Sequence, residues 1–322
     1  MTVRAWLYDA HGDDREIDIA ELNPGRVDDS KLVWIDVDER SAEELEKVAK
    51  ALELEPRIVR QLQPDRRRPR IVRQPDRIAV TLVAIERADR DSALERKDLD
   101  LVAGRNLVVT VHDGPLAAIA DFEEQLRDER DLGQLDAGTF MTALIDAVLG
   151  GYRSEVDAIE HAIDELDHAA MQTMADHDSF LASVVALRGR IAVLRRHLTP
   201  NRDAIAPLVR PDFEVHGDIV KPWPGIEERL ERTISAVENA RDLLVGSFDI
   251  YLGREAQRSN DVMKVLTLVS AIALPAIVLA GVMGMNFRLE FFENSSNFFV
   301  VFGSMVIFGL AIVAIARWRH WI

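Results

Sequence analysis

The chain has 322 residues and is 48% hydrophobic, so its length allows two or more domains and its composition allows both a packed core and membrane segments. Acidic residues outnumber basic ones by 55 to 39, and the formal net charge of -16 argues against nucleic acid as the main partner, because phosphate binding needs a basic surface. Cations are the more natural ligands. The absence of cysteine excludes disulfides, thiolate metal sites and a cysteine nucleophile.

The start of the chain, MTVRAWLYDAHGDDREID, contains no apolar run of the kind that a secretory signal requires. It is also acidic, whereas a transit peptide is basic. We therefore expect the amino-terminal part of the protein to lie in the cytoplasm.

The first part of the chain combines strand-like and helical patterns. The segment SAEELEKVAKAL has helical periodicity, and its Ser41 and Glu44 have the spacing of a helix capping box. This alternation predicts a cytoplasmic α/β domain over residues 1–136. Strands are predicted where β-branched residues are frequent, at residues 31–38, 77–87 and 106–113.

From residue 137 onward the strand pattern disappears. Residues 137–221 hold two long helical segments, which we expect to form an antiparallel hairpin in the cytoplasm. After a break at PWPG, the helical pattern continues without proline until Pro275. Residues 222–264 are thus predicted to be the cytoplasmic part of a stalk helix of about 60 residues, which is about 90 Å long at 1.5 Å per residue.

Two uncharged segments at the carboxyl end predict a transmembrane helical hairpin. The first, VLTLVSAIALPAIVLAGVMGM, has the length of the roughly 20 residues that cross a bilayer as a helix. The second, NFFVVFGSMVIFGLAIVAIA, follows after a linker too short to hold a domain. The predicted segments are a first span at 265–286, an outer loop at 287–296, a second span at 297–316 and a basic tail at 317–322.

The charges that flank the two spans predict their orientation. Lys264 precedes the first span and Arg317 and Arg319 follow the second, whereas the linker between the spans is acidic. By the positive-inside rule, both termini are cytoplasmic and the linker lies outside. Trp318 and Trp321 have the position of anchors at the membrane interface.

Two helices cannot enclose an aqueous path, so a transport function requires several chains around an axis. Residues along the first span recur at alternating spacings of three and four, which is the pattern of helices packed around a centre. Such a seam is typical either of oligomer packing or of a pore lining, and polar residues at both of its ends favour the lining. The seam consists of Asn260, Met263, Thr267, Ser270, Leu274, Ile277, Gly281 and Gly284.

Neither predicted span contains Asp, Glu, His, Lys or Arg. This argues against a proton relay or a carboxylate metal cage within the bilayer and leaves neutral oxygens as ligands. Mg²⁺ gives up its water reluctantly, so a site for it can accept hydrogen bonds from the ion's waters. Asn286 and nearby glycine carbonyls can do this. Alternatively, Asn286 is a helix C-terminal residue in left-handed conformation.

Several of these segments together resemble the CorA family of magnesium transporters. The resemblance rests on NDVMKVLT leading into a span with Pro275, on the GMN triplet at its outer end, and on the basic and aromatic tail RWRHWI. Upstream, WIDVDERSAEELEKVAKALELEP, RPRIVRQPDRIAVTLVAIER and RNLVVTVHD are similar to the family's amino-terminal domain. The resemblance therefore covers nearly the whole chain.

The resemblance implies a funnel-shaped homopentamer in which the first span lines the pore and the second lies outside it. Gly284, Met285 and Asn286 would form the outer selectivity ring for hydrated Mg²⁺. Asn260 would lie at the inner mouth, with Met263 and Leu266 near a hydrophobic constriction that gates by dewetting.

The outer loop departs from the family pattern. Many relatives have a Met-Pro-Glu stretch after the triplet, whereas this chain has RLEFFENSS. Glu290 and Glu293 either concentrate cations at the pore mouth or are simply solvated loop charges, and Arg288 offsets one of them.

The resemblance also implies that intracellular Mg²⁺ binds between protomers and holds the pore shut. Acidic side chains supply such sites, although a solvated surface charge is the more common role of any one such residue. The candidates by position are Asp89, Asp91, Glu227, Glu228 and Glu231.

Two further charged segments allow alternative interpretations. The segment EVDAIEHAIDELDH has acidic residues and two histidines at helical spacing, which suits a soft divalent ion but is more typical of a solvated face. The run RRRPRIVRQPDR is basic, but its alternation with apolar residues favours ion pairing between subunits over nucleic-acid binding.

The predicted function is therefore passive uptake of Mg²⁺, with Co²⁺ or Ni²⁺ as secondary ions, by an integral protein of a bacterial or archaeal cell membrane. Mg²⁺ is substrate and regulatory ligand, and no organic cofactor is expected. One alternative is a ZntB-type Zn²⁺ transporter with proton coupling, and another is a membrane-anchored cation sensor without flux. An enzyme is not expected, because the sequence has no phosphate-binding glycine loop, zinc-protease motif or nucleophile elbow.

Overall fold

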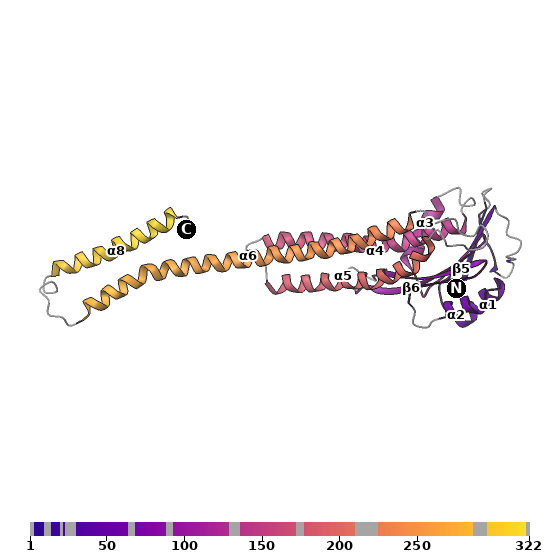
Figure 1. Ribbon diagram of the computed structural model, residues 1–322, viewed down its shortest axis with the longest axis horizontal. Coiled ribbons are helices and arrows are strands. Elements are labelled where there is room, and N and C mark those ends of the chain that lie inside the picture. The colour runs from indigo at the N-terminus through magenta and orange to yellow at the C-terminus, as the bar shows by residue number, and fades with distance from the viewer. Residues whose placement is uncertain are drawn as a thin grey trace. The chain divides into compact units, whose positions relative to one another are not determined.

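The structure of the protein is a computed structural model that describes residues 3–9, 14–19, 22, 30–63, 68–87, 93–128, 136–171, 177–209, 225–285 and 295–319. Contacts divide the described residues into two compact units (Figure 1). The first reaches Ala169 and resumes with the next helix up to Ser247, and the second consists mainly of the residues from Phe248 onward. The division falls within one helix.

A seven-stranded sheet forms the centre of the first unit, in the order β2-β1-β3-β7-β6-β5-β4. Neighbouring strands are antiparallel, except that β3 and β7 are parallel. The three predicted strand runs correspond to β3, β5 and β7, which confirms the α/β class, whereas the other strands were not predicted. The strands are β1 Val3–Asp9, β2 Arg15–Glu16, β3 Lys31–Val37, β4 Arg70–Arg73, β5 Arg77–Glu86, β6 Glu95–Gly104 and β7 Leu107–Val111.

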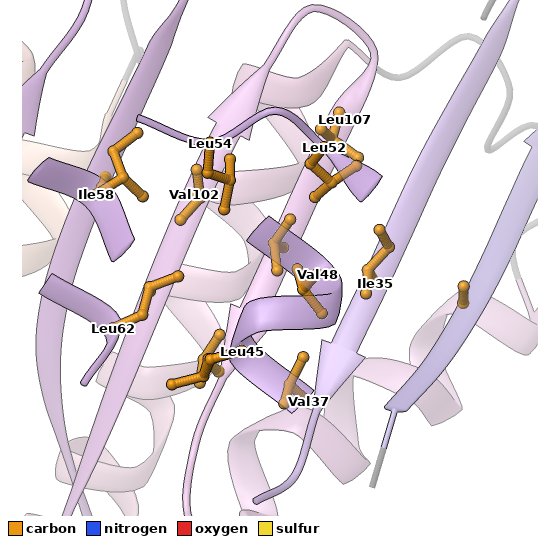
Figure 2. Close-up of a cluster of buried hydrophobic side chains, with 14 of the residues drawn as sticks. Ile35, Val37, Leu45, Val48, Leu52, Leu54, Ile58, Leu62, Val102 and Leu107 are labelled. Carbon is orange, nitrogen blue, oxygen red and sulfur yellow. The ribbon is translucent and has the colours of Figure 1, made fainter. Parts of the chain in front are cut away.

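Two short helices, α1 (Ala42–Ala51) and α2 (Pro56–Leu62), cover one face of the sheet. Ser41 begins α1 by accepting a hydrogen bond from the Glu44 backbone N–H at 3.1 Å, which is one half of the predicted capping box. Leucine and valine side chains of α1 fit between alternate residues of β3 and β7, because side chains on a strand alternate between its faces. Figure 2 shows this buried cluster.

The opposite face of the sheet carries an aromatic cluster. Trp34 of β3 meets Phe122 of α3 (Ala117–Asp128) at 5.7 Å between ring centroids and Phe140 of α4 (Ala137–Met171) at 5.5 Å. Phe122 and Phe140 meet edge to face at 4.9 Å, an arrangement that aromatic rings favour. This cluster packs α3 and the start of α4 onto the sheet.

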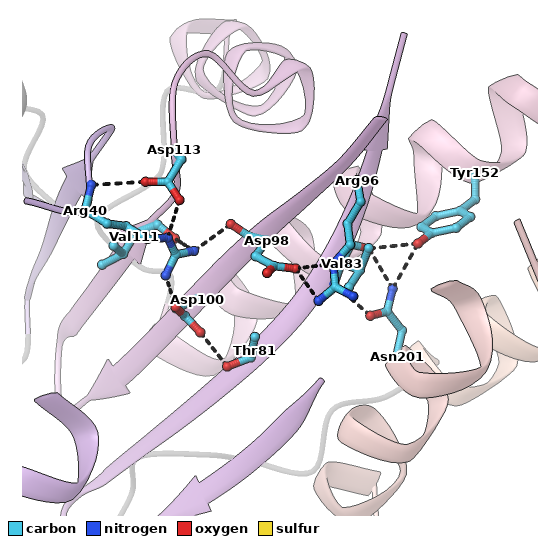
Figure 3. A network of polar contacts seen from close by, with 10 residues as sticks. All are labelled: Arg40, Thr81, Val83, Arg96, Asp98, Asp100, Val111, Asp113, Tyr152 and Asn201. Atoms are coloured by element: carbon cyan, nitrogen blue, oxygen red, sulfur yellow. Dashed lines mark hydrogen bonds and ion pairs between the residues drawn. The ribbon is translucent and has the colours of Figure 1, made fainter. Parts of the chain in front are cut away.

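A buried ion pair lies between the sheet and its helices (Figure 3). The guanidinium of Arg40 pairs with the Asp100 carboxylate and also donates to the carbonyl of Asp98 at 2.6 Å and that of Val111 at 3.0 Å. The side chains of Arg40 and Asp100 are only 2% and 1% exposed. The Thr81 hydroxyl donates to Asp100, so the buried carboxylate has more than one partner.

Three long helices complete the first unit: α4, α5 (His177–Ile205, followed by a short 3-10 turn, Ala206–Val209) and the first part of α6 (Ile226–Met283). Glu155 of α4 binds Arg190 of α5 and Arg87 of the sheet, each at 2.7 Å. Arg229 of α6 reaches α4 at Asp146, with 3.0 Å between charged atoms. The helices are thus joined by partly buried ion pairs as well as by apolar side chains.

Asn201, in the last turns of α5, completes the backbone hydrogen bonding of β5. Its Oδ1 accepts from the Val83 backbone N–H at 2.8 Å, and its Nδ2 donates to the Val83 carbonyl at 2.8 Å. The Tyr152 hydroxyl donates to the same carbonyl at 2.9 Å, and burial raises the pKa of Tyr152 (Figure 3). A buried side-chain amide therefore takes the place of a neighbouring strand.

The second unit contains the remainder of α6 and α8 (Ser295–Trp318). The 58 residues of α6 form one helix, close to the predicted length. By length and composition, α6 and residues Asn297–Trp318 are both candidate membrane spans, and their apolar windows are not buried within the chain. Such helices need lipid or further chains to cover them.

Candidate functional site

The predicted seam forms a continuous exposed stripe along the membrane part of α6. Its apolar members are among the most exposed large side chains, with Leu274 at 66% and Ile277 at 67%. No part of the described chain covers this stripe. The exposed residues are Asn260, Met263, Leu266, Thr267, Ser270, Leu274, Ile277, Gly281 and Gly284.

The opposite side of α6 carries the side chains that pack within the same chain. At about 100° per residue, these half-buried residues lie on the other side of the helix from the seam. The chain therefore uses one face of α6 for its own hairpin and leaves the seam face open. The half-buried residues on that side are Leu268, Ile272, Pro275, Ala276 and Met283, and Ala273 is half-buried at the flank of the seam.

Glycine at position 309 brings α8 close to α6. A Cβ atom built on Gly309 would lie 3.5 Å from the Ile272 Cγ2 atom, whereas one on Gly303 would have no atom within 4 Å. Small residues in membrane helices allow this kind of approach. The sequence analysis missed this contact, although the two glycines in an otherwise bulky span were a visible signal.

We expect Gly309→Leu to separate the two spans, because the larger side chain cannot fit against Ile272. The expected result is loss of the folded, monodisperse protein in detergent, measured by size-exclusion chromatography and thermal unfolding. Gly303→Leu is the matched control in the same helix and should behave like the unmodified protein. Equal behaviour of the two variants would contradict the assigned contact.

The polar groups of the seam are neutral oxygen atoms. The Thr267 hydroxyl donates to the Met263 carbonyl at 2.7 Å, one helical turn earlier. Its proton is therefore used within the helix, and the hydroxyl oxygen keeps lone pairs that can accept a hydrogen bond from water. The apolar residues Met263, Leu266, Leu274 and Ile277 lie between the polar positions. The stripe therefore alternates between levels that can hydrogen bond to water and levels that cannot.

At its carboxyl-terminal end, α6 finishes just before the GMN triplet. The Gly284 backbone N–H still donates to the Ala280 carbonyl at 2.9 Å, and that of Met285 donates to the Val282 carbonyl at 3.2 Å. The last turn thus tightens from i−4 to i−3 bonding, as helix ends commonly do. Asn286, Glu290 and Glu293 lie outside the described residues, so both interpretations of Asn286 remain predictions.

Charged side chains lie near the amino-terminal end of the stripe. Asp261 lies next to Asn260, and it binds Lys264 at 2.9 Å and accepts from Gln257 at 3.1 Å. These contacts join residues three and four apart on the helix surface, where such pairs meet. The charges of Asp261 and Lys264 therefore neutralise each other where α6 approaches its uncharged segment.

The three predicted regulatory residues that the structure describes, Glu227, Glu228 and Glu231, do not form a metal site within one chain. Glu228 pairs with Arg232, and Glu231 binds Arg202 at 2.9 Å. Glu227 and Glu228 occupy the first turn of α6, where carboxylates stabilise a helix N-terminus. Asp89 and Asp91 lie outside the described residues.

The acidic helix segment in α4 also gives no metal site. Asp167 accepts from the Ser247 hydroxyl of α6, and His161 lies 3.7 Å from Glu165 on the exposed surface. Among the residues that the structure describes, no group of three or more His, Cys, Asp or Glu is placed to hold a metal ion. A site between protomers would have to combine residues of two chains.

The basic run lies partly outside the described residues. Its described part includes β4, where Arg70 and Arg73 are exposed at the two ends of a short edge strand. Charged residues on edge strands discourage pairing with other sheets.

Comparisons with known proteins identify the family. Residues 29–317 match the family described as CorA-like Mg2+ transporter protein. The chain is 22% identical over 302 residues to the cobalt/magnesium transport protein CorA of Methanocaldococcus jannaschii, covering 92% of this chain and 93% of the relative. It is 28% identical to the putative metal ion transporter YfjQ of Bacillus subtilis, but that match covers only 60% of each chain.

The solved structures agree on the fold. The complete structure of the CorA magnesium transporter from Methanocaldococcus jannaschii matches with a TM-score of 0.73 at 22% identity, covering 100% of this chain and 99% of that one.

The zinc transport protein ZntB of an Enterobacter species is 23% identical over 88% of this chain and 84% of its own. Because the family match spans most of the sequence, this chain belongs to the CorA family of divalent cation transporters.

Proposed function

We propose that this protein carries Mg²⁺ across a cell membrane along a path lined by the seam of α6, with Co²⁺ or Ni²⁺ as secondary ions. The observation that carries the proposal is the open seam face. It is exposed over its whole length, uncharged, and turned away from the face that packs against α8. Two helices cannot enclose water, so the path requires a ring of chains, which we propose to be a homopentamer.

In this ring, each level of the seam has a distinct role. Asn260 marks the cytoplasmic mouth, and Met263 and Leu266 form an apolar constriction that blocks ions when it is dry. Thr267 and Ser270 offer oxygen atoms to the waters of the ion, and Leu274 and Ile277 line a second apolar level. Gly281, Gly284, Met285 and Asn286 surround the outer opening, where Asn286 accepts hydrogen bonds from the hydrated ion.

The driving force needs no coupled reaction. An inward-negative potential supplies about 2.3 kcal/mol per charge per 100 mV, which is doubled for a divalent cation. Glu290 and Glu293 concentrate cations at the outer mouth, and we propose that both termini face the cytoplasm, where Mg²⁺ closes the pore. Candidate ligands for this regulation are Asp89, Asp91, Glu227, Glu228 and Glu231, contributed across a boundary between chains.

A second candidate ion is Zn²⁺, because relatives named zinc transport protein ZntB cover the chain about as fully as those named CorA. Residues 265–286 and 297–316 contain no titratable side chain. This argues against coupling of zinc transport to protons through the spans. We therefore favour Mg²⁺.

The test is ion flux into liposomes that contain the purified protein. Mg²⁺, Co²⁺ and Zn²⁺ are offered separately, with and without a pH gradient, and uptake is followed with an ion-sensitive dye. We expect Mg²⁺ and Co²⁺ uptake that depends on membrane potential and not on the pH gradient. Proton-driven Zn²⁺ uptake without Mg²⁺ uptake would favour the zinc transporter, and absence of all flux would favour a sensor.

A further inference from the structure

Four charged side chains from different elements meet beneath α3, at the ends of the parallel strands β3 and β7. Asp36 of β3 is in the centre, with its side chain 0% exposed. It receives a hydrogen bond from Arg4 of β1 at 3.0 Å and lies 3.0 Å from the His112 Nε2 atom just after β7. Arg4 also reaches Glu123 of α3 at 2.8 Å.

The two ring nitrogens of His112 both face hydrogen-bond acceptors. Nε2 faces the Asp36 carboxylate, and Nδ1 lies 2.7 Å from the Gly114 carbonyl oxygen. A neutral imidazole donates from only one nitrogen, so one of these contacts would then place two lone pairs against each other. Only the doubly protonated, positively charged ring satisfies both acceptors.

The charges of the cluster lead to the same state. Asp36 and Glu123 supply two negative charges, and Arg4 supplies one positive charge. Asp38 also acts on the ring, so with a charged His112 these groups carry one net negative charge, whereas with a neutral ring they would carry two, beside the fully buried Asp36 carboxylate. An uncompensated buried charge is costly, so the balance favours the imidazolium. The exposed fraction of the His112 side chain is 3%.

The cluster lies where two strands lead into helices. The His112 backbone N–H donates to the Val37 carbonyl at 2.9 Å, and that of Gly114 donates to the Asp38 carbonyl at 2.8 Å. Gly114 has a φ of +70°, a conformation that glycine adopts readily and that turns its carbonyl back toward the His112 ring. The chain then continues from this junction into α1 on one side and α3 on the other.

We propose that His112 is a proton-dependent latch, whose charged ring holds the ends of β3 and β7 together and ties them to β1 and α3. Loss of one proton removes either the bond to Asp36 or the bond to the Gly114 carbonyl. The junction between the sheet and the helices that follow it is then weakened at alkaline pH.

The charges around His112 set the direction of the effect. Burial alone lowers the pKa of His112, but the bond and charge of Asp36, the Gly114 carbonyl and the charge of Asp38 raise it above the ordinary 6.5. A group whose pKa is raised by folding stabilises the protein fully below its unfolded pKa. This contribution is lost as the pH rises through the folded pKa.

Asp36 limits the same latch on the acidic side. Burial alone raises its pKa, but the bonds from His112, Thr110 and Arg4 outweigh this and hold the pKa below the ordinary 3.8. The contribution of Asp36 is therefore present above pH 3.8 and is lost only as the pH falls through its lower folded value. The latch is complete between the acidic range and the raised pKa of His112.

The molecule carries its own reporter of this titration. The Trp34 Nε1–H donates to the Thr110 hydroxyl at 3.0 Å, and that hydroxyl donates to Asp36 at 2.5 Å. Trp34 also stacks on Trp6, at 4.8 Å between ring centroids. Tryptophan fluorescence of the full-length protein in detergent therefore follows both the local titration and unfolding.

The experiment compares thermal unfolding between pH 6 and pH 9 for the unmodified protein and two histidine variants. The unmodified protein should lose Tm as the pH rises through this range, by a few degrees. His112→Gln cannot carry the charge, so it should have a lower Tm at pH 6 and should lack this pH dependence. His161→Gln alters an exposed histidine, 77% exposed, and should keep the unmodified profile.

A second measurement remains informative if His112→Gln fails to fold. Nitrogen NMR of the histidine rings in the unmodified full chain should show that His112 titrates above the ordinary 6.5, with its signal assigned through its contacts to Asp36 and Gly114. A His112 midpoint at or below 6.5, or a Tm profile shared by His112→Gln and the unmodified protein, would overturn the latch.

Discussion

Replacing Asn286 with alanine is expected to reduce Mg²⁺ uptake to the level of empty liposomes, while the protein still assembles. The variant removes one amide oxygen from each chain of the proposed ring, and we propose that these oxygens accept hydrogen bonds from the waters of the ion. A single hydrogen bond to a charged group contributes about 1.5–3 kcal/mol, which corresponds to a more than tenfold change in the affinity for the ion. The measurement is dye-detected uptake, with size-exclusion chromatography as the test of assembly.

The control for Asn286→Ala is Ser304→Ala, a polar change in the second span. The Ser304 hydroxyl donates to the Val301 carbonyl of its own helix at 2.7 Å, and Ser304 is not on the seam. Its loss should leave flux unchanged. Unmodified flux in Asn286→Ala would rule out the selectivity ring, whereas lost flux together with lost assembly would assign Asn286 to packing or to the helix end.

The second large effect concerns Asp100. We expect Asp100→Ala to destabilise the first unit by about 1.5–3 kcal/mol, because it removes the buried carboxylate that pairs with the Arg40 guanidinium. The bonds from Arg40 to the carbonyls of Asp98 and Val111 remain, and Asp113, whose side chain is 63% exposed and lies 3.0 Å from the Arg40 Nε atom, becomes its remaining charged partner. Chemical denaturation of the full-length protein, followed by tryptophan fluorescence, measures the change.

Two comparisons isolate the cause of that effect. The double variant Arg40→Met/Asp100→Leu removes both charges and should recover much of the lost stability, because apolar replacement of a buried pair is often close to neutral. Glu43 is a partner of Lys47 on the surface, and its side chain is 80% exposed. Glu43→Ala should therefore change stability by less than about 0.5 kcal/mol. If the double variant is as unstable as Asp100→Ala, the loss comes from packing and not from the missing buried partner of Arg40.

The elements that the sequence predicted share strong local patterns. The apolar strands β3, β5 and β7 and the uncharged spans are visible in short windows, because their burial on both faces or in lipid requires continuous hydrophobic residues. Helix α1 was predicted from its periodicity and from Ser41. In each case the local preference agrees with the final environment.

Strand β6 was missed for a physical reason. Its charged residues, including Asp98 and Asp100, are unusual in a strand with neighbours on both sides. Asp100 is tolerated in the interior because Arg40 and Thr81 reach it from other elements. No local window contains that information, since Arg40 is 60 residues away.

The seam and the His112 cluster show the same contrast. The seam follows from one helix and its spacing, so the sequence was sufficient to propose it, whereas the face that binds α8 depends on a second helix. Asp36 and His112 both lie in segments noted for other reasons, but they are 76 residues apart. Only the parallel pairing of β3 with β7 places them together.

The amide of Asn201 has a consequence for how copies of this protein meet. Strand β4 pairs with only the first part of β5, from Ile78 to Thr81, and would leave the Val83 backbone groups open to another strand. Asn201 occupies them, and exposed arginines stand at both ends of β4. Strand addition, a common route to misassembly, is thereby blocked along this border. A partner at this border would therefore have to bind through side chains and not through sheet hydrogen bonds.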